Sequence, residues 1–209
     1  MYSRQELALK RLFDVAVAVT GLAVASPALL VIGLLVKVSS PGAALFRQRR
    51  VGRHGRVFWL LKFRTMVSGD GPLVTAQGDP RVTTVGRALR RSKLDELPGL
   101  LNVVMGDLSL VGPRPEVPKY VAHYPAADRE LLQRYRPGIT DPATVQFRNE
   151  EQLLAHALDP EELYLSKILP TKLRLYREYL EEATFISDFR ILAQTVAVIV
   201  APELSRPAI

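Results

Sequence analysis

Residues 12–38 form a nearly uninterrupted apolar run close to the start of the sequence. At about 27 residues, the run is long enough as one straight helix to span a bilayer core of roughly 30 Å. A cleaved signal peptide fits less well. Although Ala23-Val24-Ala25 has the small-x-small form of a cleavage site, the apolar run continues well beyond it. We therefore expect a membrane-associated segment rather than a removed leader.

Pro27 follows Ser26 about halfway along this run. Because proline has no amide hydrogen and clashes with the preceding turn, it kinks or breaks a helix. Basic residues flank the run on both sides: Arg4, Lys10 and Arg11 before it, and Lys37, Arg47, Arg49, Arg50, Arg53 and Arg56 after it. Since positive flanks favour the cytoplasm, we expect a re-entrant helix-break-helix, bent at Ser26–Pro27, that dips into one leaflet and returns. A true span stays open as the alternative, because the more basic C-terminal flank could set the orientation alone.

A turn cluster, Ser39-Ser40-Pro41-Gly42, ends this segment. It divides the chain into a membrane hairpin, residues 1–40, and a cytoplasmic domain lying on the membrane, residues 41–209. Residues 45–51 and 56–64 are predicted to form two strands, joined by the four-residue loop Gly52-Arg53-His54-Gly55. The start of the second domain is therefore predicted to be a small β-hairpin.

Helical patterns dominate the rest of the chain. Apolar residues at helical spacing form a wide face on one segment, namely Leu94, Leu97, Leu101 and Val104. A basic stripe precedes it, made of Arg87, Arg90 and Arg91, and is typical of a helix lying in the head-group plane, with a solvated face as the plainer alternative. Asp159-Pro160 predicts a helix start, with the helix reaching about Ala183. Residues 191–201 are apolar but too short to span, so we expect an interfacial or core helix there. The predicted fold class is α+β, mostly helical, with interfacial amphipathic helices.

Charge and cysteine content limit the classes of binding partner and the kinds of metal site that the chain can have. Lys and Arg number 28 against 21 acidic residues, which gives a formal charge of +7. This balance suits anionic partners such as phospholipid head groups, pyrophosphates or nucleic acid. Nucleic acid is disfavoured, because the basic residues are scattered among apolar segments and no aromatic stacking platform is evident. The absence of cysteine excludes disulfides and thiolate metal sites and fits a cytosol-facing protein.

The adjacent acids Asp95 and Glu96 are the strongest candidates for chemistry. They lie at the edge of the apolar face, where a charge costs desolvation unless a cation meets it. Arg91, one helical turn earlier, or a divalent metal held by carboxylate oxygens would meet that need. Taken alone, such a pair near a helix start is more often a cap or a response to the helix dipole.

Four further cationic side chains are candidates for binding an anion. Lys62 and Arg64 are two residues apart on a predicted strand and so share one face. Arg114 lies between two prolines that hold it in an extended or turn conformation, and a fixed guanidinium matches two phosphate oxygens at once. Arg136, which precedes Pro137-Gly138, repeats this design. The plainer interpretations are a solvated basic edge for the strand and a stiff loop for the Pro-Arg-Pro turn.

Five stretches, in this order, resemble the motifs of the small monotopic phosphoglycosyl transferases, a bacterial sugar transferase family. They are Lys62-Phe63-Arg64-Thr65-Met66, Asp79-Pro80-Arg81-Val82, Leu94-Asp95-Glu96-Leu97-Pro98, Gly106-Asp107-Leu108-Ser109-Leu110-Val111-Gly112-Pro113-Arg114-Pro115 and Arg136-Pro137-Gly138-Ile139-Thr140. The resemblance implies the same re-entrant hairpin, bent at a Ser-Pro pair. It also implies transfer of a sugar 1-phosphate from a nucleotide diphosphate sugar, expected to be a UDP-sugar, to polyprenyl phosphate, as the first membrane step of glycoconjugate synthesis.

By this resemblance, Asp95 is the nucleophile and forms an aspartyl-phosphosugar intermediate. Asp95 and Glu96 would hold Mg²⁺, with the division of roles between them left open. The substrate-binding candidates are Lys62, Arg64, Arg91, Arg114 and Arg136. The expected location is the cytoplasmic face of the inner membrane, in contact with phospholipid, and a homodimer is compatible. The competing interpretation is a basic peripheral membrane scaffold without catalysis.

Overall fold

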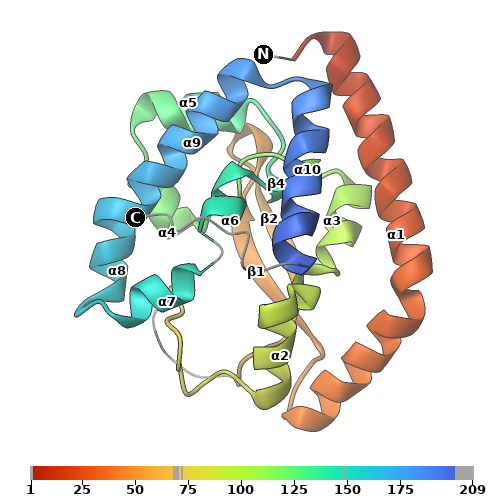
Figure 1. The fold of residues 1–209 in the computed structure, drawn as a ribbon, viewed down its shortest axis with the longest axis vertical. Coiled ribbons are helices and arrows are strands. Elements are labelled where there is room, and N and C mark those ends of the chain that lie inside the picture. The colour runs from red at the N-terminus through yellow and green to blue at the C-terminus, as the bar shows by residue number, and fades with distance from the viewer. Residues whose placement is uncertain (1, 68–70, 72, 148, 201–209) are drawn as a thin grey trace.

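The computed structural model describes residues 2–67, 71, 73–147 and 149–200. Within these residues the fold is mostly helical with two small two-stranded sheets, which confirms the predicted α+β class. Figure 1 shows the long helix α1 along one side of the molecule, with the other helices gathered around the sheets. Helix α1 ends at Ser39, next to the predicted domain boundary. The division into domains at that point stays a prediction.

Helix α1 (Arg4–Ser39) is long and apolar enough to cross a membrane, judged by length and composition, and no other helix in the described part of the chain meets that test. A capping box begins it: the Glu6 amide donates to Ser3 Oγ at 3.2 Å, and the Ser3 amide donates to the Glu6 carboxylate at 2.9 Å. Many of its apolar side chains are more than half exposed, among them Leu12, Val24, Leu30, Leu34 and Val38. An apolar surface of this extent needs a cover other than water.

The expected discontinuity at Ser26–Pro27 is a bend within a continuous helix, not a break. Figure 1 shows α1 changing direction partway along, with its second half turned toward α2 (Thr84–Ser92). In a regular helix the Ala23 carbonyl would accept from the amide of residue 27, which proline lacks. The Ser26 hydroxyl donates to that carbonyl instead, at 2.8 Å. The Ser-Pro pair thus allows the bend while keeping the freed carbonyl hydrogen-bonded.

The predicted hairpin is confirmed. Strands β1 (Leu45–Val51) and β2 (Val57–Phe63) pair antiparallel, and the short 3₁₀ turn η1 (Arg53–Gly55) joins them. Strand β2 is one residue shorter at each end than predicted. His54 and Gly55 both have positive φ, 58° and 72°, which is the tight turn that the Gly-x-x-Gly spacing indicated.

The segment after the hairpin is broken into three short pieces. Helix α2 ends where Lys93 adopts φ 59°; the 3₁₀ turn η2 (Leu94–Glu96) follows, and α3 (Gly99–Met105) begins after Pro98. Helix α3 packs along α1 and β2. The buried Asn102 binds the edge of β2: its Nδ2 donates to the Trp59 carbonyl at 2.8 Å, and its Oδ1 accepts from the Leu61 amide at 3.0 Å. This side chain fixes η2 and α3 against the hairpin.

A second sheet, not predicted from the sequence, pairs β3 (Ser109–Val111) with β4 (Gly138–Thr140) in parallel. The strands continue into a close approach at Gly112 and Gly138. A Cβ at Gly138 would lie 2.2 Å from the Gly112 nitrogen, so only glycine fits there. The Pro-Arg-Pro turn and the Arg-Pro-Gly turn are thereby held side by side.

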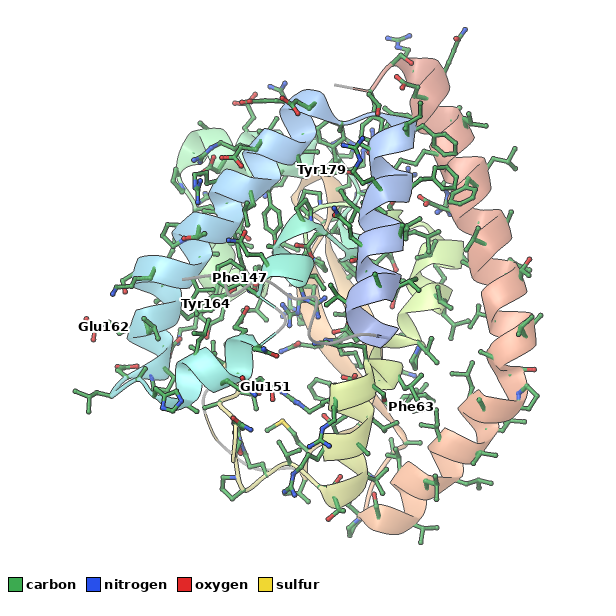
Figure 2. The ribbon with its side chains drawn as sticks, in the orientation of Figure 1. Phe63, Phe147, Glu151, Glu162, Tyr164 and Tyr179 are labelled. Carbon is green, nitrogen blue, oxygen red and sulfur yellow. The ribbon has the colours of Figure 1, made fainter. Side chains whose placement is uncertain are left out.

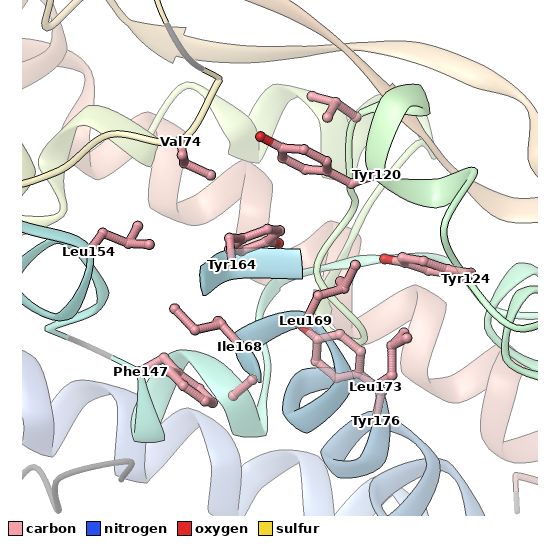
Figure 3. Close-up of a cluster of buried hydrophobic side chains, with 12 residues drawn as sticks. Val74, Tyr120, Tyr124, Phe147, Leu154, Tyr164, Ile168, Leu169, Leu173 and Tyr176 are labelled. Carbon is pink, nitrogen blue, oxygen red and sulfur yellow. The ribbon is translucent and has the colours of Figure 1, made fainter. Parts of the chain in front are cut away.

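Eight further helical segments complete the fold. They are α4 (Pro118–Val121), α5 (Ala126–Gln133), α6 (Pro142–Gln146), α7 (Glu150–Ala155), α8 (Pro160–Leu163), the π-helical turn η3 (Tyr164–Ile168), α9 (Leu169–Glu182) and α10 (Phe185–Val200). Buried side chains of α4, α6, α7, η3 and α9 form one core cluster, which includes Tyr164, Ile168 and Tyr176 (Figure 3). Ile191 of α10 belongs to a second cluster, together with Leu180 of α9 and Ala18 of α1. The predicted helix start at Asp159 is confirmed, since its carboxylate accepts from the amides of Glu161 and Glu162.

Helix α10 begins six residues earlier than the apolar run predicted. Phe185 and Phe189 pack on Phe13 of α1, with ring centroids 5.5 and 4.8 Å away, and Lys10 donates to Asp188 at 2.6 Å. Tyr179 of α9 also donates to Asp188, at 2.7 Å. Figure 2 shows Tyr179 where α9 and α10 come close to the start of α1. The first turns of the apolar helix are therefore built into the body of the fold.

Candidate active site

Asp95 lies on the single 3₁₀ turn between α2 and α3 and is only 7% exposed. Its Oδ1 is buried and has no hydrogen-bond partner among the described residues. Burial, aided by the negative charge of Glu96, raises the pKa of the Asp95 carboxyl above its usual value. A buried carboxylate oxygen without a partner is costly in a folded protein and marks this turn as a functional candidate.

Glu96, the neighbouring acid, is held by two cations. Arg114 forms a two-pronged ion pair with it, in which Nη2 donates to Oε1 and Nη1 donates to Oε2 at 3.3 Å. Lys62 Nζ donates to Oε1 at 3.1 Å. Burial alone would raise the pKa of Glu96, but the charges of Arg114 and Lys62 outweigh it and hold the pKa well below its usual range. Glu96 is therefore a fixed anion over the whole neutral range.

Lys62 and Arg114 come from different elements, Lys62 from β2 and Arg114 from the turn after β3. Burial lowers the pKa of the Lys62 ammonium, and the charge of Glu96 works against that shift. A cavity of about 20 Å³ adjoins the ion pairs and is lined in part by Lys62, Glu96, Arg114 and Ile139. The site thus brings an acid with an unpaired oxygen next to a compact arrangement of alternating charges.

Arg64 does not lie in this arrangement. It is 8% exposed and donates to the carbonyls of Val36 at 3.2 Å, Ser40 at 2.7 Å and Pro41. Strand β2 ends at Phe63, so the face shared with Lys62 does not continue to Arg64. The guanidinium stabilises the C-terminal end of α1, where backbone carbonyls lack helical partners. A contact between Arg64 and substrate stays a prediction.

The other two cationic candidates also lie apart from Glu96. Arg91 is exposed and forms no ion pair within the described residues. Its neighbour Arg90 turns inward and donates to Glu151 of α7 at 2.5 Å (Figure 2 labels Glu151). Arg136 donates to the Gly106 carbonyl at 2.9 Å, at the far end of α3 from Asp95. The cations that meet the acid pair are Lys62 and Arg114 rather than Arg91, and the substrate roles of Arg91 and Arg136 remain predictions.

The acid pair is compatible with magnesium bound together with substrate. In the part of the chain that the structure describes, no three His, Cys, Asp or Glu side chains gather into a metal-binding cluster. Mg²⁺ usually keeps several waters and binds through one or two carboxylates plus substrate phosphates. Asp95 Oδ1 supplies an oxygen that accepts no hydrogen bond from the described residues. Both Glu96 oxygens already accept hydrogen bonds, so Asp95 is the better-placed ligand of the two.

Comparison with known proteins identifies the family. The family model described as "Bacterial sugar transferase" matches residues 5–202, which is nearly the whole chain. The chain belongs to the bacterial sugar transferase family.

Named relatives of this bacterial sugar transferase come from several bacteria. A UDP-glucose:undecaprenyl-phosphate glucose-1-phosphate transferase of Caulobacter vibrioides is 49% identical over 142 residues, covering 66% of this chain and 53% of the relative. A putative undecaprenyl-phosphate N-acetylgalactosaminyl 1-phosphate transferase of Bacillus subtilis is 41% identical, covering 64% and 72%. An Escherichia coli UDP-glucose:undecaprenyl-phosphate glucose-1-phosphate transferase is 37% identical over 198 residues, covering 90% of this chain and 39% of the relative. The chain thus spans about half the length of the Caulobacter relative.

Sequence reasoning missed two buried polar residues that hold the site of this sugar transferase together. Asp14, an acid inside the apolar run, accepts from Ser109 Oγ at 2.6 Å and from the Leu110 amide at 3.3 Å. Asn102, inside the run Leu-Leu-Asn-Val-Val, binds the edge of β2. Both were visible as polar residues in apolar segments, a pattern that indicates a specific buried partner. Through Asp14, α1 is attached to β3, the strand that leads to Arg114.

Proposed function

We propose that this chain transfers a sugar 1-phosphate from a UDP-sugar to polyprenyl phosphate, of which undecaprenyl phosphate is the form named in its relatives. The family assignment and the printed activities of the Caulobacter and Escherichia coli relatives support this reaction. The single observation that carries the proposal is the buried, unpartnered oxygen of Asp95 beside the Lys62–Glu96–Arg114 ion pairs. A scaffold without catalysis gives no reason to bury a carboxylate in this state.

The reaction proceeds in two steps. A carboxylate oxygen of Asp95 attacks the phosphorus that bears the sugar, a P–O bond forms to Asp95, and the P–O bond to UMP breaks, so that UMP leaves. An oxygen of the lipid phosphate then attacks the same phosphorus, and the bond to Asp95 breaks. The first step consumes the free Asp95 carboxylate, and the second step regenerates it.

The surrounding charges suit this chemistry. Attack by an anion on a diphosphate is opposed by repulsion, which fixed cations reduce. Lys62 and Arg114 present such charges, while Glu96 holds both in place. Mg²⁺, held by Asp95 with or without Glu96, would neutralise phosphate charge when bound with the donor. Chelation of divalent ions should then abolish turnover, and added Mg²⁺ should restore it.

The apolar helix suits a reaction between a soluble and a lipid substrate. With α1 re-entrant in the cytoplasmic leaflet, the protein is monotopic and its acid pair lies near the head groups, where polyprenyl phosphate presents its phosphate. The exposed apolar side chains of α1 and its basic flanks support this placement. Such a reaction is the first membrane step in building a glycoconjugate.

Purified full-length chain in detergent, with Mg²⁺, a panel of labelled UDP-sugars and undecaprenyl phosphate, tests the proposal. We expect UMP release and a labelled lipid product, both lowered at least 1,000-fold in Asp95→Asn. Without lipid phosphate, label should become covalently attached to the protein and be lost in the same variant. The matched control is Asp159→Asn, a substitution of the exposed residue that caps the start of α8. UMP release that is unaffected by Asp95→Asn would overturn the assignment of the nucleophile.

A further inference from the structure

Three arginines lie together away from the acid pair, two of them at the C-terminal end of α3. Arg11 donates from Nη1 to the Val103 carbonyl at 2.7 Å and from Nη2 to the Val104 carbonyl at 3.2 Å. Arg136 donates from Nε to the Gly106 carbonyl at 2.9 Å. Arg53, at the hairpin tip, donates from Nε to the Arg134 carbonyl at 3.0 Å. Each of the three is held by backbone carbonyls, and within the described residues none of them forms an ion pair.

The three guanidinium groups line one cavity of about 270 Å³. Its walls come from the first turns of α1, the hairpin tip, the turn after β3 and the segment Arg134–Arg136. Tyr2 and Tyr135 form an aromatic side of it, with ring centroids 6.2 Å apart. This cavity is far larger than the 20 Å³ one at the acid pair, and neither Asp95 nor Glu96 lines it.

The charges inside this cavity are unbalanced. Asp14 is the one acid among the described residues that line it, and its two oxygens accept hydrogen bonds from Ser109 and the Leu110 amide. Lys10 also lines it and is paired with Asp188. Burial, followed by the positive charges of Arg11 and Arg53, lowers the pKa of Arg136, and the negative charge of Asp14 works against that shift. Nearby like charges disfavour one another's charged forms, and a bound anion would relieve that repulsion.

We propose that Arg11, Arg53 and Arg136 form a second anion site that binds a phosphate or diphosphate group. Guanidinium groups whose Nε is fixed on a carbonyl present their Nη atoms to phosphate oxygens in a pre-organised fork. Arg53 and Arg136 are fixed in this way. Because Arg11 directly precedes the apolar run, the phosphate can belong to a phospholipid head group at the interface or to a soluble diphosphate. The site does not depend on the proposed transferase reaction.

Two measurements on the full chain separate these sources. In detergent, isothermal titration with inorganic pyrophosphate tests a soluble ligand. In nanodiscs of phosphatidylglycerol or phosphatidylcholine, native mass spectrometry of retained lipid tests a head group. The test variant is Arg53→Gln, and the matched control is Arg56→Gln, an exposed arginine three residues away that lies outside the cavity.

We expect Arg53→Gln to weaken one of the two interactions at least tenfold, while Arg56→Gln changes neither by more than twofold. Loss of pyrophosphate binding assigns the site to a soluble diphosphate, and loss of retained phosphatidylglycerol assigns it to the head group. Either result supports the site, whether or not the chain has transferase activity. Equal behaviour of the two variants in both measurements would overturn it, provided that both unfold at the wild-type temperature. Arg53→Lys, which keeps the charge but not the fork, should recover part of the lost binding.

Discussion

Arg114 and Glu96 form a two-pronged ion pair that joins the Pro-Arg-Pro turn to the acid pair. The Arg114 guanidinium uses both Nη atoms, one on each oxygen of Glu96, and its Nη1 also donates to the Ile139 carbonyl at 3.4 Å. One side chain therefore ties β4, the turn after β3 and η2 together. The position of Asp95 depends on this contact, because Asp95 is the residue next to Glu96.

Replacing Arg114 by lysine keeps the charge but removes the fork. We expect Arg114→Lys to lower the proposed transferase activity by about 10- to 100-fold, since an ammonium cannot bind both oxygens in one plane. UMP release under saturating substrate is the measurement. Arg174→Lys on the exposed face of α9 makes the same chemical change without the contact and should keep wild-type activity. Equal activities of the two variants would mean that the fork is dispensable.

The ion pairs of Glu96 should also appear as a pH dependence of stability. Because the pKa of folded Glu96 lies well below its usual value of 4.5, its charge stabilises the fold above that value. This stabilisation is lost as the pH falls toward the folded pKa. The wild type should therefore lose melting temperature between about pH 5 and pH 3 more steeply than Glu96→Gln, with EDTA present throughout. Glu178→Gln, which removes an exposed carboxylate on α9, should follow the wild type. Parallel curves for wild type and Glu96→Gln would show that these ion pairs do not stabilise the fold.

The sequence predicted the elements whose signals are local. The alternating strands around Gly-x-x-Gly predicted the hairpin, and Pro27 marked the bend in α1. Strands β3 and β4 escaped prediction because three residues are too few for a periodic pattern, and their pairing joins segments that are far apart in the chain. Helix α10 begins early because Phe185 packs on Phe13, a contact across the whole sequence.

The candidate site shows the same difference between local signals, which the sequence carries, and long-range contacts, which it does not. The acids and the rigidity of Arg114 followed from neighbouring residues, whereas the partners did not. Arg91 is closer to Glu96 in sequence than Arg114 or Lys62, yet the parallel sheet brings Arg114 to Glu96 and the hairpin brings Lys62. Arg64 was grouped with Lys62 by strand alternation, but the strand ends before it and its guanidinium binds the end of α1. The spacing of neighbouring residues cannot show which distant segments of the chain pack together.

Asn102 should contribute strongly to stability. Its side chain is fully buried and satisfies the Trp59 carbonyl and the Leu61 amide on β2. Asn102→Leu keeps a similar volume but leaves both backbone groups without these partners, which should cost about 2–5 kcal/mol. Thermal unfolding in detergent measures the loss, and the exposed Gln194→Leu on α10 serves as the control. A melting temperature that falls no further than in the control would mean that water replaces both contacts.

The topology of α1 is open to a direct test, since the chain contains no cysteine. Gln5→Cys places a single exposed thiol near the start of the helix, and Ala43→Cys places one shortly after its end. A membrane-impermeant maleimide should label both thiols from the cytoplasmic side only, because Pro27 bends the helix and Ser26 satisfies the freed Ala23 carbonyl, which lipid could not do. Labelling from opposite sides would establish a span. Adding Pro27→Ala restores the missing amide and removes the cause of the bend, so it should increase labelling of Ala43→Cys from the other side. Gly33→Ala alters the same helix where a Cβ has room, 3.8 Å from the nearest atom, and should leave the labelling unchanged.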